Sequence, residues 1–447
     1  MLRCDIVTSQ YPGAMAIPPR PEHCRSMSFS PARPHADPAA EAATLLCRIG
    51  LAILGIAVPC AATGARRAVF VLMPVGSVLI LISALLDSGG EGRAHLRNGV
   101  LTIAGIAAVF LLAWASLSLL WTPFRLEAAA RFSKEAGTML LALIVCAFLP
   151  ERTRISNLNL WPVGVGLAGL ATLGVALAGP TLLAAAQEGE NSTSERGLLS
   201  AVVLLWPALA ALALRQRWNS AGGIAIVVAV AAILVWSPAG LIGLIAGALV
   251  FAAAANHPAR AAPVLALGFV ALLVAAPALP FAMEWLGGKG PVETEGFSGA
   301  VQSNARVWAQ IIRNDGWRLL PGHGIDSSTR GMAGGFLPAR TPHSLLFELW
   351  FELGALGVAA FAVMVWQGFA ACGRQAIALA PFLLAGLTSL LVVAILGFSL
   401  SQLWWVTVIG IVGIATTHVL RGQYLTRRPH IEPARMRAAP PQQAMAE

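Results

Sequence analysis

His343 stands where a long polar stretch, about residues 285–342, meets an apolar run. Its imidazole could take up a proton near neutral pH, and Pro342 before it suits a helix start; the alternative is a plain interfacial side chain. Glu348 and Glu352 follow, four residues apart inside the apolar run. A buried acid in lipid is costly and needs a partner, so both are functional candidates or members of an interhelical hydrogen bond.

The polar stretch itself predicts a short amphipathic helix over residues 303–316. Ser303 suits its start and Gly316 its end. Arginines and a glutamine at spacings of four and three share one face, and a tryptophan and two isoleucines form an apolar flank. These residues are Arg306, Gln310 and Arg313, with Trp308, Ile311 and Ile312. The helix is either a site or an interfacial helix with snorkelling arginines.

A tight turn follows at residues 321–328, which read Pro-Gly-His-Gly-Ile-Asp-Ser-Ser and include His323. Its glycines supply unusual dihedral angles, so a plain turn is favoured over a phosphate-binding nest of backbone N–H groups. Two other cationic places stand at the ends of apolar runs. Arg196 begins one run, and Arg131 lies in an amphipathic stretch over residues 121–135, where Glu127 and Glu135 are spaced to pair with it.

The composition defines the class of protein. Of 447 residues, 57% are hydrophobic and only 11% are charged, with a mean hydropathy of +0.73. This excludes a cytosolic enzyme, a disordered chain and a disulfide scaffold. The net charge is +9, and the basic residues are scattered between apolar runs rather than gathered on one face. This pattern predicts membrane lipids as partners and no nucleic acid. Six cysteines without a Cys-x-x-Cys motif indicate neither a metal site nor disulfides.

The predicted fold class is an all-α polytopic membrane protein with about twelve transmembrane helices and one long periplasmic loop containing short helices. Residues 1–44 are expected to be a disordered cytoplasmic tail and residues 421–447 a cytoplasmic tail. Helices one to nine fill 45–284, the loop 285–342, and helices ten to twelve 343–420. The expected spans lie near 45–62, 68–86, 100–121, 137–150, 161–183, 197–214, 222–237, 239–256, 262–284, 343–367, 376–398 and 402–420.

Arginine counts set the expected orientation. With the N-terminus inside, the short cytoplasmic loops hold eight cations against six outside, and the C-terminal tail adds five more. The long loop then lies outside. A polar loop of this length in so apolar a chain is the expected carrier of function.

Three sequence elements resemble the O-antigen ligase and polymerase superfamily of bacterial membrane glycosyltransferases. The first is Leu-Ser-Leu-Leu-Trp-Thr-Pro at 117–123. The second is the Arg306–Trp308 helix followed by Pro-Gly-His-Gly at 321–324. The third is His343-Ser344 leading into Glu-Leu-Gly-Ala-Leu-Gly at 352–357. Ser344 departs from the usual asparagine of the family, and His323 fills a variable position of the glycine turn.

The resemblance implies a GT-C fold and a metal-independent enzyme without cofactor, multi-pass in the bacterial inner membrane, with its active site on the periplasmic face. Its donor would be an undecaprenyl-diphosphate-linked glycan and its acceptor lipid A–core or another glycan. Arg196 and Arg306 would hold the diphosphate and His343 would orient or deprotonate the acceptor. Arg313, Arg131 and His323 are weaker candidates for substrate binding. A polymerase of the same superfamily, or a twelve-helix transporter, are the alternatives.

Overall fold

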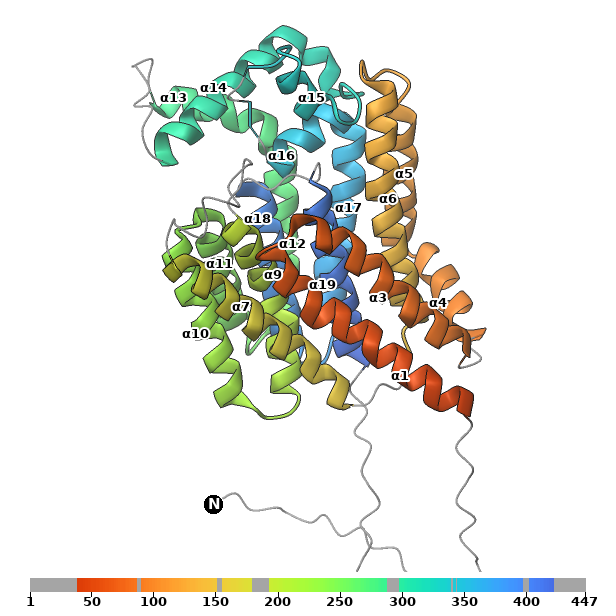
Figure 1. Ribbon diagram of the computed structural model, residues 1–447. Coiled ribbons are helices and arrows are strands. Elements are labelled where there is room, and N and C mark those ends of the chain that lie inside the picture. The colour runs from red at the N-terminus through yellow and green to blue at the C-terminus, as the bar shows by residue number, and fades with distance from the viewer. Residues whose placement is uncertain are drawn as a thin grey trace, which may run out of the picture. The chain divides into compact units, whose positions relative to one another are not determined.

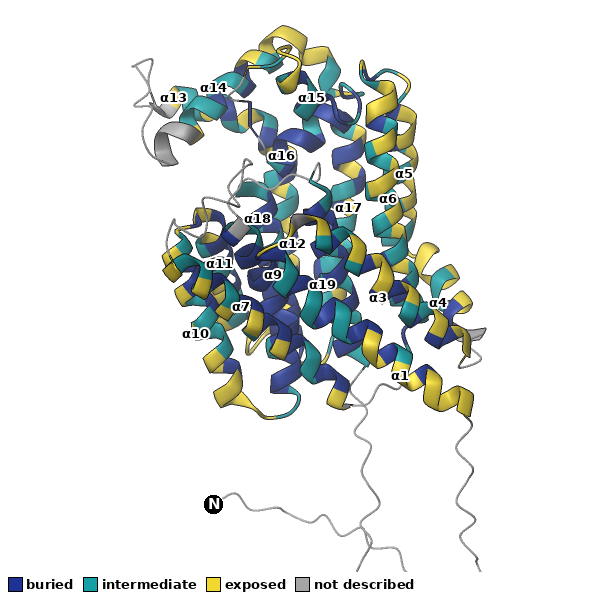
Figure 2. Cartoon of the chain, in the orientation of Figure 1, coloured by how far each residue is buried: buried dark blue, intermediate teal, exposed yellow. Residues whose placement is uncertain are grey.

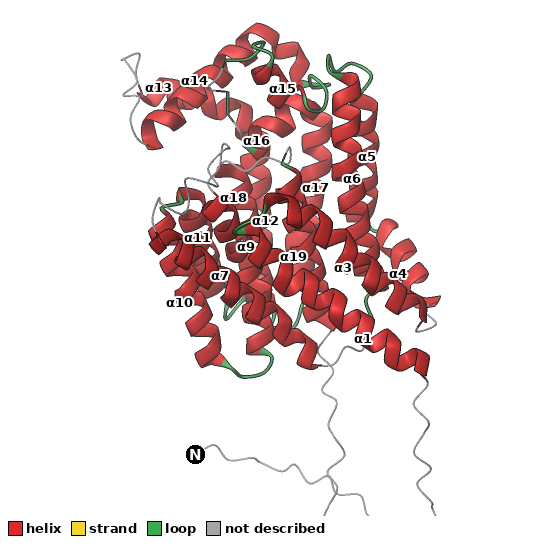
Figure 3. Cartoon of the chain, in the orientation of Figure 1, coloured by secondary structure: helices red, strands yellow, loops and turns green. Residues whose placement is uncertain are grey.

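The computed structural model describes residues 38–86, 90–150, 155–178, 193–287, 297–338, 341–342, 344–396 and 402–421. Across these ranges the chain is helical, with short turns and no strand (Figure 3). This agrees with the all-α class expected from the composition.

Helices of the first half alternate with short turns. They are α1 (Pro38–Ala52), η1 (Ile53–Ala57), α2 (Val58–Ala62), α3 (Arg66–Leu86), α4 (Gly90–Val100), α5 (Ile103–Ser118), α6 (Arg125–Phe148), η2 (Ile155–Asn159), α7 (Leu160–Ala178), α9 (Thr193–Ala213), α10 (Trp218–Val235) and α11 (Pro238–Ala254).

Helices of the second half include the short elements of the long loop. They are α12 (Pro258–Ala275), η3 (Ala276–Ala278), α13 (Leu279–Gly287), α14 (Phe297–Asp315), η4 (Gly316–Leu319), α15 (Ser327–Ala333), α16 (Leu345–Glu348), η5 (Leu349–Leu353), α17 (Gly354–Gly373), α18 (Ala380–Leu396) and α19 (Leu403–Arg421).

The described part of the chain is that of a multi-pass membrane protein. It contains eight helices long and apolar enough to cross a bilayer, or nine if α4 and α5, bent by 76°, form one span. The expected count of twelve is therefore too high for these ranges. Helices α11 and α18 are apolar but have 17 residues each, or about 25 Å.

The amphipathic stretch 121–135 and the span 137–150 are not separate elements, which corrects the prediction. Helix α6 runs without a break from Arg125 to Phe148. A single Gly137 does not stop a helix, and residues spaced four apart in the first turns support it. Because its first turns carry these charges, α6 is not one of the eight helices that are apolar enough to cross a bilayer.

Local sequence explains several helix boundaries. Thr102 caps α5 by accepting a hydrogen bond from the Gly105 N–H at 3.0 Å. Ser237 caps α11 in the same way, with Pro238 in the first turn. Ser344 caps α16 by accepting from the Phe347 N–H at 3.3 Å. Caps of this type satisfy backbone donors that have no partner within the helix.

The core of the bundle surrounds α9. In its most apolar stretch 94% of the residues are buried, against 22–67% for the other spans. Figure 2 shows the corresponding change from buried central helices to exposed outer faces on α3, α5 and α10. Exposed apolar side chains on those outer faces suit contact with lipid rather than water.

The loop elements gather at one end of the bundle. Figure 1 shows α14 and α15 there, with α15 beside the tip of the hairpin formed by α5 and α6. The side-chain contacts below confirm that the hairpin tip and the loop share this end. We call it the loop end and the other the far end.

Candidate functional site

The tip of the α5–α6 hairpin holds the glycine turn of the loop. Ser118 Oγ accepts a hydrogen bond from the Ile325 N–H, and Thr122 Oγ1 donates to the Ile325 carbonyl, both at 3.1 Å. Gly324 between them has a φ of +97°, and a Cβ there would lie 3.0 Å from the Ser118 carbonyl oxygen. Only glycine meets both demands.

The opposite face of the same turn is held by η5. The His323 N–H donates to the Phe351 carbonyl at 2.7 Å, and the Gly324 N–H donates to the Glu352 carbonyl at 3.0 Å. Gly322, with a φ of +80°, approaches so closely that a Cβ would overlap the Glu352 carbonyl oxygen. The turn is therefore held between the tip of the α5–α6 hairpin and η5, an arrangement that we call the glycine clamp.

The carbonyls that accept these bonds belong to an irregular part of the span. η5 has π-helical hydrogen bonding, and Gly354 after it has a φ of +63°. Trp114 of α5 donates to the Leu353 carbonyl at 2.8 Å, and Trp350 donates to the Leu273 carbonyl of α12 at 2.8 Å. Side chains thus support the break, and π-helical turns are frequent at functional sites.

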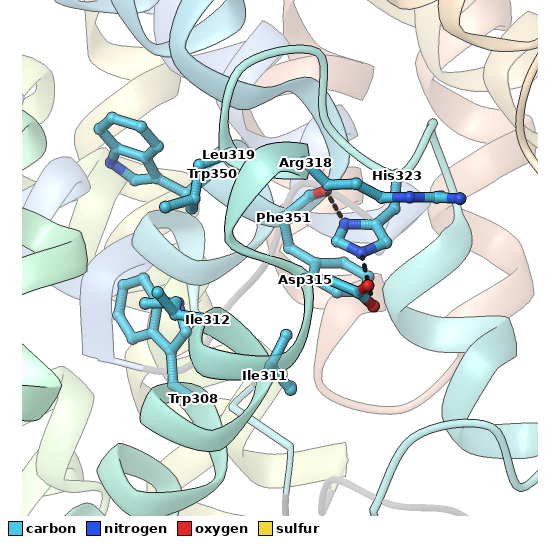
Figure 4. Close-up of a pocket in the computed structure, with 9 residues that line it drawn as sticks. All are labelled: Trp308, Ile311, Ile312, Asp315, Arg318, Leu319, His323, Trp350 and Phe351. Atoms are coloured by element: carbon cyan, nitrogen blue, oxygen red, sulfur yellow. Dashed lines mark hydrogen bonds and ion pairs between the residues drawn. The ribbon is translucent and has the colours of Figure 1, made fainter.

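His323 lies between the turn and η5. Its ring stacks on Phe351 with centroids 4.0 Å apart, and its Nδ1 lies 3.0 Å from the Phe351 carbonyl oxygen (Figure 4). Because a carbonyl only accepts, we assign the proton to Nδ1. Nε2 then points toward Asp315, whose Oδ2 is 3.8 Å away. The pKa of His323 is lowered below 6.5 by burial and by the nearby positive charge of Arg318. The Phe351 carbonyl and Asp315 act in the opposite direction, but their effect is smaller.

A small cavity lies beside His323. Its walls come from α14, η4, the glycine turn and η5, and Figure 4 shows the indoles of Trp308 and Trp350 on its apolar side. The volume is about 10 Å³, roughly that of one water molecule. A sugar or diphosphate does not fit this cavity as it stands.

Asp326 is a buried acid of the loop that pairs with two arginines. It is 2% exposed, has a φ of +63°, and ion-pairs through its two oxygens with Arg131 of α6 and Arg330 of α15. The Arg330 contact measures 2.7 Å, and Arg131 also contacts Glu135 at 3.1 Å. The carboxylate joins α6 to the loop.

Glu352 has the structural partner that its cost in the membrane requires. Its Oε1 accepts hydrogen bonds from the backbone N–H of Ser328 at 3.1 Å and from the Ser328 hydroxyl at 2.5 Å. Ser328 lies in the first turn of α15, so this acid holds the loop to η5. Of the two alternatives that the sequence left open for Glu352, this contact fits the hydrogen-bonded structural role.

Two of the predicted substrate-binding residues, Arg131 and Arg313, have acidic partners in the structure. Arg131 pairs with both Asp326 and Glu135, so its pairing within α6 is only part of its role. Arg313 pairs with Glu284 of α13, and its guanidinium lies 5.2 Å from the Phe281 ring centre. Both arginines therefore have local structural roles.

Arg196 and Arg306 lie on helices that share one hydrophobic cluster, to which α16, the helix after His343 in sequence, also belongs. Leu199 of α9, Trp308 of α14 and Phe347 of α16 all belong to it, and the last two rings meet edge to face at 5.5 Å. Arg196 is in the first turn of α9, and Arg306 is half-buried on α14. His343 lies outside the described residues, between the buried Pro342 and the cap of α16. Convergence of these three side chains stays a prediction.

Sequence reasoning missed the contacts that organise this site. From sequence, Asp326 stood out only as a member of the glycine turn, and Arg330 and Ser328 did not stand out. The one available signal was an aspartate directly after a glycine turn, a residue type that tolerates left-handed backbone. Its partner in α6 lies 195 positions away, so no local pattern could reveal it.

Chemically, the loop end offers arginines and a histidine around a rigid turn. Within the ranges that the structure describes, no group of three or more histidine, cysteine or acidic side chains is placed to hold a metal ion. Comparison of the chain with protein-family models and with curated proteins finds no match. Functional inference therefore depends on the site itself.

Proposed function

We propose that this protein is a membrane glycosyltransferase that transfers a polyprenyl-diphosphate-linked glycan to an acceptor such as lipid A–core, as O-antigen ligases do, on the periplasmic face of a bacterial inner membrane. One observation carries the proposal. The 117–123, 321–324 and 352–357 segments, which bear the sequence resemblance, meet in one clamp through hydrogen bonds at Ile325, Phe351 and Glu352. This contact gives the three segments a common structural purpose.

The reaction needs positively charged side chains at the membrane surface, where the diphosphate of the donor lies. An acceptor hydroxyl oxygen attacks the anomeric carbon, and the bond from that carbon to the diphosphate oxygen breaks. The diphosphate leaves with the electron pair, and the hydroxyl proton passes to a base. We assign the leaving diphosphate to Arg196 and Arg306, whose planar guanidinium groups stabilise the developing charge. We assign the proton to His343.

The glycine clamp supports this assignment through positioning. Arg306 and His343 flank the clamp in sequence, on α14 and just before α16. Trp308 of α14 packs on Phe347 of α16 at 5.5 Å, so the two elements are held together beside the clamp. A fixed frame of this kind limits the motion of reacting groups, which is a large part of enzymatic rate enhancement.

The test is transfer in vitro, with purified protein, an undecaprenyl-diphosphate glycan and a lipid A–core acceptor. Arg306→Lys should lose most activity, because a point charge cannot replace the two-pronged contact. The matched control Arg125→Lys changes an exposed arginine at the same end and should keep near-normal transfer. If folded Arg306→Lys protein kept full activity, the assignment of Arg306 to the diphosphate would be refuted.

His343→Ala should abolish transfer while donor binding persists, because the base acts only in the chemical step. Excess chelator should leave the rate unchanged. Inhibition that Mg²⁺ reverses would instead indicate a metal-dependent transferase. A polymerase of the same superfamily is distinguished in a deletion strain: single lipid-linked units accumulate if a polymerase is lost, and long unattached chains if a ligase is lost.

A further inference from the structure

The first turn of α9, which carries Arg196, is joined to the start of α11 by one buried hydroxyl group. Ser237 is 2% exposed and donates its O–H to Glu195 Oε1 at 2.9 Å. The same hydroxyl oxygen accepts a hydrogen bond from the Gly240 N–H at 3.3 Å and so caps α11. Because Glu195 directly precedes Arg196, this contact ties the turn that carries the guanidinium to a second helix.

Close packing holds the same turn from another side. A Cβ on Gly197 would overlap Thr63 Cγ2 and lie 3.0 Å from Thr63 Cα, so the start of α9 is in direct contact with the end of α2. A Cβ on Gly240 would lie 3.3 Å from Leu198 Cδ2, which shows that α11 is equally near. The first turn of α9 is therefore held between α2 and α11.

The turn that presents Ser237 is itself in a strained conformation. Trp236, which ends α10, has a φ of +53° and a ψ of 47°. Left-handed backbone is an outlier for so bulky a side chain and persists where the surrounding contacts determine the turn. The two hydrogen bonds of Ser237 are contacts of this kind.

The junction belongs to the part of the bundle that contacts the long loop. Leu199 of α9 and Ala239 of α11 are members of the hydrophobic cluster that also contains Trp308 of α14 and Phe347 of α16. The turn that carries Arg196 is thus connected through one core to the elements that carry or follow the other two assigned residues.

We propose that Ser237 is a positioning residue for glycan transfer, which acts through Glu195 to set the place of Arg196 at the donor diphosphate. This inference rests on the proposed function, in which Arg196 binds that diphosphate. A guanidinium that is already in place stabilises the charge developing on the leaving group, whereas a mobile one must first be ordered. Loss of Ser237 should therefore lower kcat more than it raises the KM for the donor.

The test is the kinetics of transfer by the purified full chain, with an undecaprenyl-diphosphate glycan and a lipid A–core acceptor. Ser237→Ala should lower kcat about tenfold, the factor for one hydrogen bond to a charged group, and change the donor KM by less than about twofold. Ser237→Thr keeps the hydroxyl and should keep most of the rate. The matched control Thr102→Ala removes a cap of the same kind from α5, at the far end, where the hydroxyl donates to the Gly99 carbonyl; it should keep near-normal transfer.

A double-mutant cycle separates positioning from a general loss of structure. In Arg196→Gln protein, adding Ser237→Ala should change the residual rate by less than about twofold, because the guanidinium that Ser237 positions is already gone. Equal losses from Ser237→Ala in both backgrounds would overturn the inference, as would a full rate of the single variant.

Hydrogen exchange reports on the contact without the reaction. In a peptide covering residues 197–201, exchange should accelerate about tenfold in Ser237→Ala and stay unchanged in Thr102→Ala. Unchanged exchange in Ser237→Ala would show that Ser237 does not hold the turn, and would also overturn the inference. If wild type transfers no glycan, the proposed function fails and this inference with it; if wild type is active and the cycle is additive, only the inference fails.

Discussion

Substituting Gly322 by alanine tests whether the close approach of Gly322 to the Glu352 carbonyl, and not only the positive φ of the glycine, is needed to hold the loop on η5. Gly322 and Gly335 both have positive φ, +80° and +75°. A Cβ at Gly322 overlaps the Glu352 carbonyl oxygen, whereas a Cβ at Gly335 has no atom within 4 Å. The two substitutions share the dihedral cost and differ only in the collision.

The magnitudes separate the two outcomes. The positive φ costs alanine about 1–2 kcal/mol at either position. At Gly322 the turn must also move off η5, which breaks the hydrogen bonds from the His323 and Gly324 N–H groups, at about 1 kcal/mol each. We expect Gly322→Ala to destabilise the clamp by about 3–4 kcal/mol, and Gly335→Ala to affect only its own turn.

Hydrogen exchange followed by mass spectrometry measures this directly. In a peptide covering residues 322–326, exchange should accelerate by about a hundredfold or more in Gly322→Ala, because 1.4 kcal/mol is a factor of ten. Gly335→Ala should leave that peptide unchanged. If both variants accelerate its exchange equally, the clamp does not depend on close approach and the reasoning fails.

Two further predictions concern charges in the loop. Asp326→Asn should destabilise α15 by about 2–3 kcal/mol, less than for a fully buried pair because Arg131 and Arg330 are partly exposed. Glu135→Gln, which removes an i,i+4 partner, should cost below about 1 kcal/mol; an equal loss in α15 exchange protection would contradict the assignment. Because the folded pKa of His323 is lowered, its contribution to clamp stability is present above about pH 6.5 and is lost as pH falls through the folded value. His323→Gln should abolish this pH dependence of exchange, and its persistence would exclude His323 as the titrating group.

The clamp gives the long loop a fixed relation to the bundle. Side chains of Ser118 in α5 and of Thr122 in the turn before α6 hold one face of the glycine turn, and backbone carbonyls of η5 hold the other. The Asp326 ion pairs fasten the adjacent helix. A loop tied in this way can present functional groups at the membrane surface without closing a separate domain over them.

Several features followed from sequence because they depend on neighbouring residues. The amphipathic face of α14 was predicted from spacing: Trp308 is buried and Gln310 and Arg313 are exposed, although Arg306 of the same face is half-buried. The predicted start at Ser303 is wrong, since the helix begins six residues earlier, at Phe297. The glycine turn was predicted from composition, and Gly322 and Gly324 have the expected positive φ. The all-helical, multi-pass character followed from hydropathy, since backbone groups in lipid must be paired internally.

Tertiary structure decided what depends on distant residues. The continuity of α6 was missed, because polar and apolar halves were treated as separate elements. The pairing of Arg131 with Asp326 and of Glu352 with Ser328 joins residues far apart in the chain. Sequence supplied the arginines, acids and glycines, whose types are fixed by local chemistry. Helix packing determined which guanidinium pairs with which carboxylate. All arginines have the same intrinsic affinity for an aspartate, so only their distance from it in the folded chain distinguishes them.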